Sequence, residues 1–215
     1  MTADPPDAAG HGRRKRRAPR PLDATRLRDM ALRYVARYAT TRHKLDRYLR
    51  RKVAERGWSG DTAADVDALI EYCVAQGFVD DALYAENKAA SLSRRGYGRR
   101  RIDASLHEAG ISAEDAAAVH EDGEVRRWSS ALMLAKRRRI GPFAPEAANA
   151  GEVRQSEADI EARHRQRQKQ IQIMARAGHD FTIAATLVDA RSLEQLRAVG
   201  DEQLDIALDA LLPPQ

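Results

Sequence analysis

The side chains that most often carry out chemistry are few and dispersed in this sequence. The single cysteine, Cys73, lies in a helical apolar stripe, which favours a small core residue over a nucleophile or a zinc ligand. The histidines are scattered, with no paired spacing typical of metal ligands: His11, His43, His107, His120, His164 and His179. We therefore expect no catalytic residue, no metal site, no cofactor and no enzymatic activity.

Two further motifs have structural explanations that outweigh their chemical ones. The adjacent carboxylates Asp80 and Asp81 could form an acidic site, but they precede an apolar helical pattern and are better explained as a helix cap. Gly96-Tyr97-Gly98 lacks the further glycines and the preceding strand of a phosphate-binding loop. The end of one helix followed by a turn accounts for both glycines.

Clustered arginines and lysines are the strongest candidates for a binding site. One group surrounds a predicted turn between helices: Arg94, Arg95, Arg99, Arg100 and Arg101. A similar group precedes it: Arg42, Lys44, Arg47, Arg50 and Arg51. A third runs from Lys136 to Arg139. Such groups bind phosphates or acidic proteins. Tyr48 and Tyr97 could stack on bases, although a tyrosine after a helix-ending glycine more often packs on its own helix.

Charge is divided into zones along the chain. Residues 22–56 contain eleven Lys/Arg and four Asp/Glu, a net charge of +7. Residues 57–93 contain one Lys and seven acids, and residues 177–215 contain two Arg and seven acids. The basic zones suggest an anionic partner, whereas the acidic zones argue against a uniform nucleic-acid clamp. Solvated helix faces remain an alternative explanation for any single zone.

A helical unit that recurs along the chain must position these cations. Leu45 and Leu49 correspond to Ile102 and Leu106, each pair shifted by 57 residues, and a fainter copy spans residues 174–188. Recurrence of one unit is typical of repeat proteins, which bind along extended surfaces. The composition favours helices throughout, with 32% charged and only 5% aromatic residues.

We therefore predict an all-α fold of tandem three-helix repeats in an elongated, curved molecule. Residues 1–21 are expected to be a disordered basic tail, and order should begin near Asp23. The expected division is repeat 1 at 22–77, repeat 2 at 78–140, a linker at 141–155 and repeat 3 at 156–215. Within it, one helix should start after Asp61 and an acidic helix should span residues 192–212.

The compartment is also open to prediction. One cysteine excludes an internal disulfide, no apolar run reaches the ~18–20 residues that span a bilayer, and Arg13 to Arg17 are not followed by the apolar segment of a secretory signal. We expect a cytoplasmic protein without membrane contact, and a monomer.

Several segments together resemble the RecX family of recombination regulators. They are ALRYVARYATTRHKLDRYLRRK, GFVDDALYAENKAASLSRRGYGRRRIDASLHEAGI, RRRIGPF and MARAGHDFTIAATLV. The second segment is the most specific. The third copy departs from the common pattern, because Ala177-Gly178-His179 stands where a basic glycine turn is expected.

This resemblance implies a helical repeat protein that binds the RecA recombinase along the groove of its nucleoprotein filament. It implies that the protein mainly inhibits recombinase, ATPase and coprotease activity in DNA repair and the SOS response, without a cofactor. The residues expected to contact RecA or DNA are Arg47, Arg51, Arg94, Arg95, Tyr97, Arg99, Arg100 and Arg101. Two alternatives stay open: a helical DNA-binding protein that acts independently of RecA, and a scaffold for another protein.

Overall fold

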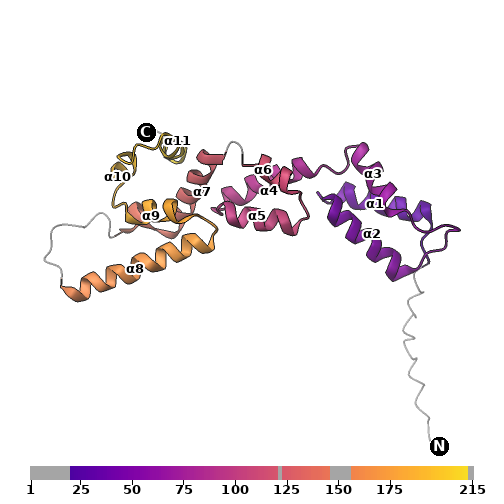
Figure 1. The fold of residues 1–215 in the computed structure, drawn as a ribbon, viewed down its shortest axis with the longest axis horizontal. Coiled ribbons are helices and arrows are strands. Elements are labelled where there is room, and N and C mark those ends of the chain that lie inside the picture. The colour runs from indigo at the N-terminus through magenta and orange to yellow at the C-terminus, as the bar shows by residue number, and fades with distance from the viewer. Residues whose placement is uncertain (1–19, 121–122, 146–155, 213–215) are drawn as a thin grey trace, which may run out of the picture.

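The computed structural model describes residues 20–120, 123–145 and 156–212. Within these ranges the chain forms eleven α-helices, one short 3-10 helix and no strand, which confirms the predicted all-α class. The expected tail at 1–21 and the expected linker at 141–155 lie largely outside the described residues. No helix in the described ranges is long and apolar enough to cross a membrane. The helices form an elongated molecule (Figure 1).

The first cluster contains α1 (Ala24–Arg37), α2 (Arg42–Arg56) and α3 (Val66–Ala75). The first helix begins where predicted, because the Asp23 carboxylate accepts a hydrogen bond from the Arg26 amide at the start of α1. The third helix starts at Val66, later than expected, because Asp65 rather than Asp61 provides its cap. Leucines from α1 and α2 form the centre of this core, with Val66 and Ile70 of α3 packed against them.

The second cluster contains α4 (Asp81–Arg94), α5 (Arg99–Glu108) and α6 (Ala113–Ala118). Asp80 caps α4 by accepting a hydrogen bond from the Leu83 amide, as the capping interpretation of the acidic pair predicted. Two buried alanines of α4, Ala85 and Ala89, belong to the same core as Ile102 and Leu106 of α5. Small residues on one helix leave room for larger ones on its neighbour.

The third cluster begins with α7 (Gly123–Arg138), whose residues fall within the expected repeat 2 at 78–140. The other members are η1 (Gly141–Phe143), α8 (Glu157–Arg176), α9 (Phe181–Asp189), α10 (Leu193–Arg197) and α11 (Glu202–Leu211). Trp128, Leu132 and Leu134 of α7 share one core with α8, α9 and α11. The expected boundary at residue 140 therefore falls inside a packed core, because the apolar stripe of α7 faces the C-terminal helices.

The predicted acidic helix at 192–212 is two helices instead of one. Gly200 lies between α10 and α11 with a φ of 73°, a left-handed conformation that ends the first of them. Asp201 then caps α11 by accepting hydrogen bonds from the amides of Gln203 and Leu204. The break lets α11 turn back and pack along α7, as the shared core requires.

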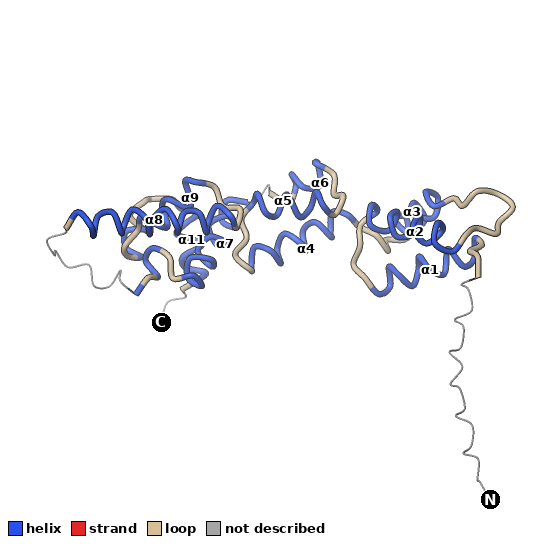
Figure 2. The backbone as a smooth tube through the Cα atoms, turned by 90° about the horizontal axis from the view of Figure 1, so that it is seen from below, coloured by secondary structure: helices blue, strands red, loops and turns tan. Residues whose placement is uncertain are grey.

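Backbone contacts join α8, α5 and α2 end to end, in the reverse of their order in the sequence. The amides of Gly98 and Arg100 at the start of α5 donate to carbonyl groups at the end of α8, those of Ala177 and Gly178, at 2.9 and 3.1 Å. At the other end of α5, the Thr41 hydroxyl before α2 donates to the Ala109 carbonyl at 2.6 Å. Figures 1 and 2 both show the three helices in a row along the molecule. This row is called the helix line below.

Candidate partner-binding surface

Three of the five predicted cations on α2 are used in contacts within the molecule. Arg42 pairs with Glu71. Lys44 donates to the Tyr84 hydroxyl at 2.5 Å and lies 4.6 Å from the centre of its ring, so it joins the first cluster to the second. Arg50 pairs with two aspartates, one on α2 and one on α3. These three residues are therefore bound chiefly to their own molecule.

Arg47 and Arg51, the two residues of α2 predicted to contact a partner, are less engaged. Arg47 is exposed and has no ion-pair partner in the part of the chain that the structure describes. Arg51 is 62% exposed, and its ion pair with Glu55 is long, at 3.6 Å. An exposed pair of this kind contributes little stability and competes weakly with another anion. Both guanidinium groups are thus available to a partner.

The turn between α4 and α5 brings three of the predicted residues together. The guanidinium carbons of Arg95 and Arg101 lie 5.5 and 5.9 Å from the centre of the Tyr97 ring. The ring is half-buried and packs against both the second and the third core. Tyr97 therefore packs between the second and third clusters, and only part of its ring is exposed.

The remaining predicted arginines of this turn are exposed. Arg94 and Arg100 have no ion-pair partner among the described residues, and Arg99 has a distant one, Asp103 at 3.8 Å. Arg94 and Arg95 lie at the end of α4, and the other three arginines form the first turn of α5. One short turn of the chain therefore carries a compact group: Arg94, Arg95, Arg99, Arg100 and Arg101. We call this group the α5 corner.

The two predicted groups lie toward opposite ends of α5. This helix has ten residues and is therefore about 15 Å long. Beyond Arg101 it carries Asp103 and Glu108 and no lysine or arginine. The helix line is continuous, but its positive charge is interrupted between the α5 corner and the cations of α2.

The third copy of the turn has a packing role. Gly178 and His179 are buried against the start of α5, and His179 Nε2 lies 3.1 Å from the Gly96 carbonyl oxygen, to which it donates. Burial lowers the pKa of the His179 imidazole, and this hydrogen bond opposes the effect. The imidazole is therefore held neutral, and His179 itself presents no cation to a partner.

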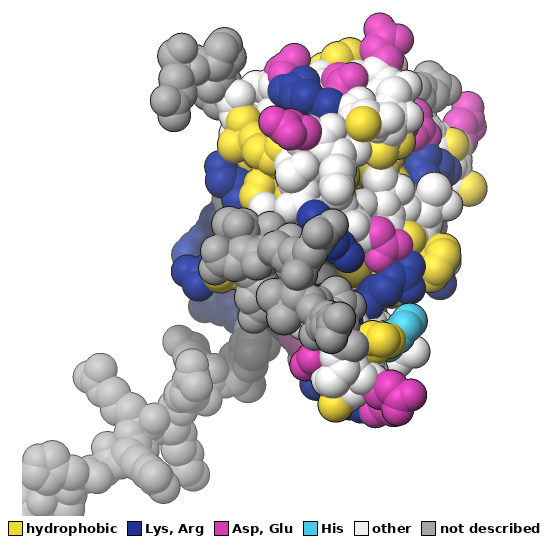
Figure 3. Space-filling view, turned by 90° about the vertical axis from the view of Figure 1, so that its left-hand side faces the viewer, with side chains coloured by type: hydrophobic (Ala, Val, Ile, Leu, Met, Phe, Trp, Pro, Cys, Tyr) yellow, Lys and Arg dark blue, Asp and Glu magenta, His cyan; other side chains and the backbone are white. Residues whose placement is uncertain are grey.

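The last helices of the molecule carry acidic side chains, in contrast to the arginines of the α5 corner. Figure 3 views this end and shows acidic side chains around its upper part, interspersed with apolar groups and few cations. The sequence of residues 177–215, with its seven acids and two arginines, explains this view. Both of the ion pairs of Arg197 are with aspartates of α11, Asp205 and Asp209. A polyanion would therefore avoid the surface formed by α10 and α11.

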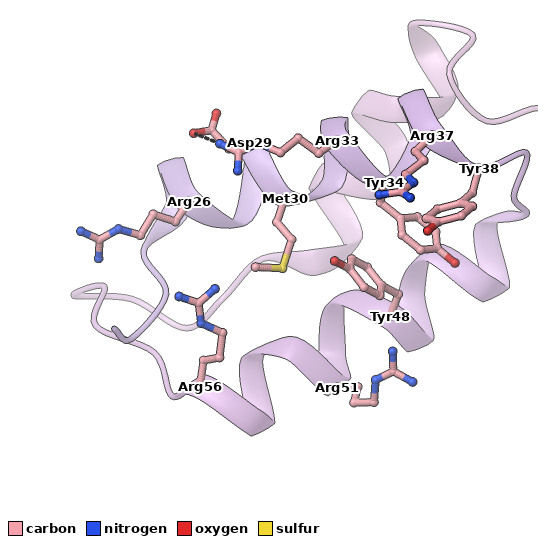
Figure 4. Close-up of a pocket in the computed structure, with 10 residues that line it drawn as sticks. All are labelled: Arg26, Asp29, Met30, Arg33, Tyr34, Arg37, Tyr38, Tyr48, Arg51 and Arg56. Atoms are coloured by element: carbon pink, nitrogen blue, oxygen red, sulfur yellow. Dashed lines mark ion pairs between the residues drawn. The ribbon is translucent and has the colours of Figure 1, made fainter. Parts of the chain in front are cut away.

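A groove between α1 and α2 was not predicted from the sequence. It has a volume of about 780 Å³, and cations and tyrosines line much of it. Figure 4 shows its lining: Arg26, Asp29, Met30, Arg33, Tyr34, Arg37, Tyr38, Tyr48, Arg51 and Arg56. The signal in the sequence was the spacing of Arg26, Arg33 and Arg37, which places all three on one face of a helix.

Side chains that could bind a metal are not grouped in the described ranges. They contain no group of three or more His, Cys, Asp or Glu side chains that could hold a metal ion. Cys73 is buried in the first core, where burial raises the pKa of its thiol and keeps it protonated. What the surface offers is a set of exposed guanidinium groups on an extended helical scaffold.

Comparison with known proteins agrees with this architecture. Residues 80–119 match a family model described as the second three-helix domain of RecX, and these residues span α4 to α6. The crystal structure of RecX from Lactobacillus salivarius is similar in fold, with a TM-score of 0.58 at 16% sequence identity, over 81% of this chain and 97% of the other.

Two sequence relatives extend the similarity. The regulatory protein RecX of Cronobacter sakazakii is 32% identical over 134 residues, which cover 59% of this chain and 78% of that relative. The regulatory protein RecX of Myxococcus xanthus is 32% identical over 179 residues, which cover 80% of this chain and 89% of that relative. Since the similarity to the Myxococcus xanthus protein covers most of both chains, this chain belongs to the RecX family of regulatory proteins.

Proposed function

We propose that this protein binds the RecA nucleoprotein filament and restrains its recombinase, ATPase and coprotease activities in DNA repair. In this proposal it acts in the cytoplasm as a monomeric regulator and not as an enzyme. Membership of the RecX family supports the proposal. The observation that carries it is the helix line, which presents exposed guanidinium groups near both ends of α5.

The geometry suits a partner that is itself a repeating polymer. The α5 corner and the pair Arg47 and Arg51 are more than about 20 Å apart along the helix axes, since α5 alone is about 15 Å long. Two such groups can contact neighbouring filament subunits at the same time. Each contact is weak, but the second becomes intramolecular once the first has formed, which raises the overall affinity without a deep pocket.

Binding of this kind can regulate without chemistry. If the filament has an active and an inactive arrangement of subunits, a rigid ligand favours the arrangement that matches its own spacing. The helix line supplies that rigidity, because backbone hydrogen bonds join α8 to α5 and the buried Thr41 hydroxyl bonds α2 to the end of α5. In this mechanism the protein inhibits RecA by shifting the filament toward a less active arrangement.

The test is an ATP-hydrolysis assay with RecA, single-stranded DNA and increasing amounts of the protein. The triple variant Arg99→Ala, Arg100→Ala, Arg101→Ala should require at least ~10-fold more protein for half-inhibition, because it removes three exposed guanidinium groups from the α5 corner. The matched control is Lys136→Ala, Arg137→Ala, Arg138→Ala, which removes the same charge from exposed positions at the end of α7.

Circular dichroism should show unchanged helix content in both triple variants, since all six positions are exposed. Inhibition by the α5 variant at wild-type concentrations would refute the assignment of the α5 corner. Equal losses in both variants would mean that net charge alone, and not the helix line, determines binding. Absence of inhibition by the wild-type protein, together with absence of filament binding, would refute the proposed function as a whole.

A further inference from the structure

The groove between α1 and α2 combines cations with flat aromatic surface in a way that packing alone does not explain. Its walls are contributed by two helices that converge at the first core, with Tyr34 on α1 and Tyr38 directly after it on the side opposite Tyr48 of α2 (Figure 4). Tyr34 and Tyr48 are stacked, with ring centres 4.1 Å apart and an angle of 16° between the rings. Tyr38 continues this group, with its ring centre 5.3 Å from that of Tyr34.

Tyr38 is the member of this group that is open to a ligand. It is 50% exposed, which is unusual for a large ring beside other aromatic rings. Its backbone position, as the C-cap residue directly after α1, fixes where the ring emerges. The guanidinium group of Arg37 lies 5.5 Å from the ring centre, so a flat, electron-rich surface and a positive charge are offered together.

The charge of the groove is strongly positive. Five arginines line it against one carboxylate, that of Asp29. Arg37 has no ion-pair partner within the described residues, and the ion pair of Arg33 with Asp29 is at the limit of contact, 4.0 Å, with the arginine 84% exposed. Cations left in this state are available to phosphate oxygens.

Arg56 adds a further hydrogen-bond donor to the wall of the groove. Its side chain extends from α2 toward the space between the helices in Figure 4. Its Nε atom is buried and has no hydrogen-bond partner in the described structure, whereas Nη2 donates to the Arg20 carbonyl at 3.1 Å. A buried guanidinium donor without an acceptor is costly unless a bound group supplies one.

We infer that the groove between α1 and α2 is a binding site for single-stranded nucleic acid, in which Tyr38 stacks on a base and Arg33, Arg37 and Arg56 contact phosphates. The stretch of α1 from Arg26 to Tyr38 is about 18 Å long, which corresponds to on the order of five nucleotides at the stacked spacing of ~3.4 Å. Stacking on an exposed ring together with phosphate contacts is the usual means of binding a single strand without sequence preference.

Other ligand classes use less of this site. In a duplex the faces of the bases are stacked on each other and are closed to Tyr38. An acidic peptide would contact the arginines, but it offers no flat ring for the tyrosine group. This inference does not rest on the proposed function, because the groove would bind a single strand in the absence of any recombinase.

The experiment measures fluorescence anisotropy of a labelled oligothymidylate of about 12 nucleotides, within the usual site sizes of about 4–16, with the full-length protein and no RecA. Tyr38→Ala should raise the dissociation constant between about 5-fold and 150-fold, the range expected for one lost stacking contact. An abasic strand of the same length should bind wild type and Tyr38→Ala equally, because it has no base to stack.

Two matched controls separate the groove from general effects. Phe181→Ala removes an aromatic ring that is 67% exposed at the start of α9, far from the groove, and should leave binding unchanged. Arg33→Glu with Arg37→Glu should weaken binding at least ~10-fold and reduce its salt dependence. Arg137→Glu with Arg138→Glu makes the same change of charge on α7 and should have a smaller effect.

Several results would overturn the inference. Equal losses in the two charge-reversal variants would show that binding is a general electrostatic effect. An unchanged dissociation constant for Tyr38→Ala, with wild-type helix content, would exclude stacking in the groove. If the groove variants lose RecA inhibition but keep full oligonucleotide binding, the groove contacts a protein instead. Failure of the α5 corner variants to affect RecA would leave the inference intact, since that result concerns a different surface.

Discussion

Gly98 and Gly178 are in direct backbone contact where α5 begins and α8 ends. A Cβ atom on Gly98 would lie 2.5 Å from the carbonyl carbon and oxygen of Gly178, and one on Gly178 would lie 2.5 Å from the amide nitrogen of Arg101. No side chain fits at either position. The absence of two side chains is therefore what allows the backbone hydrogen bonds between α8 and α5 to form.

Replacing Gly98 should disrupt this junction. Gly98 has a φ of −83°, which any residue can adopt, so Gly98→Ala tests the close approach alone. We expect a loss of about 2–3 kcal/mol in the free energy of unfolding, because backbone atoms of α8 cannot move as a flexible side chain can. Urea denaturation measures the loss.

Gly77→Ala is the matched control for this variant. Gly77 has a φ of 69°, but a Cβ atom there would meet nothing within 4 Å. Its cost is the conformational penalty alone, about 1 kcal/mol. If Gly98→Ala proved no more destabilising than Gly77→Ala, the close approach of α5 and α8 would not be important for stability.

The joint between α5 and α2 depends on one buried hydroxyl group. Thr41 is fully buried, donates to the Ala109 carbonyl at 2.6 Å and accepts from the Lys44 amide at 3.2 Å. Thr41→Val keeps the shape and removes both hydrogen bonds, so unfolding should become easier by about 1–3 kcal/mol. Thr182→Val, at an exposed position of α9, should change stability by less than about 0.5 kcal/mol. If both variants lost similarly little stability, the hydrogen bond between Thr41 and Ala109 would not be important for the contact between α5 and α2.

Stability should fall as the pH drops below about 6.5, the ordinary pKa of histidine. The pKa of His179 is lowered by burial in the folded protein, so the unfolded chain binds the proton more readily. The contribution of His179 to stability is therefore fully present above its pKa in the unfolded chain. It decreases as the pH falls toward the pKa of His179 in the folded protein. His179→Gln should reduce the change in melting temperature between pH 7.5 and 5.5. His164→Gln, at an exposed position of α8, should keep the wild-type dependence of melting temperature on pH.

The two groups of exposed arginines should contribute independently to RecA inhibition. Arg47→Ala with Arg51→Ala should weaken inhibition, and combination with the α5 corner variant should multiply the two effects. Sites more than about 7–10 Å apart that share no partner usually have additive free energies. Half-inhibiting concentrations in the ATPase assay provide the comparison. A combined effect no larger than that of the α5 variant would mean that α2 does not contact the filament.

Local signals in the sequence located most helices and their ends. Asp23 and Asp80 cap α1 and α4, and Gly110, with a φ of 76°, follows α5. A cap depends on residues three positions apart, and an apolar stripe depends on neighbours within a few turns. The same local logic is insufficient at Asp65, where more than one aspartate could begin the helix, and at Gly200, where a glycine divides one expected helix into two.

The binding residues were predicted as types and clusters, and the structure separated them by availability. Lys44 and Arg50 look equivalent to Arg47 in the sequence, but they are held by Tyr84 and by two aspartates. Contacts between different helices, such as Lys44 with Tyr84 and Arg50 with Asp67, are invisible to spacing rules, because the partners meet only when the helices pack. The groove between α1 and α2 was missed for the same reason.

The sequence by itself determined that this chain is helical, where most helices begin, and that its cations gather in a few short segments. The tertiary structure decided that α7 joins the C-terminal core, that α8, α5 and α2 form one line, and which guanidinium groups stay free. The physical reason is range: caps and stripes act over a few residues, whereas Thr41 bonds to Ala109 68 positions away and His179 to Gly96 83 positions away.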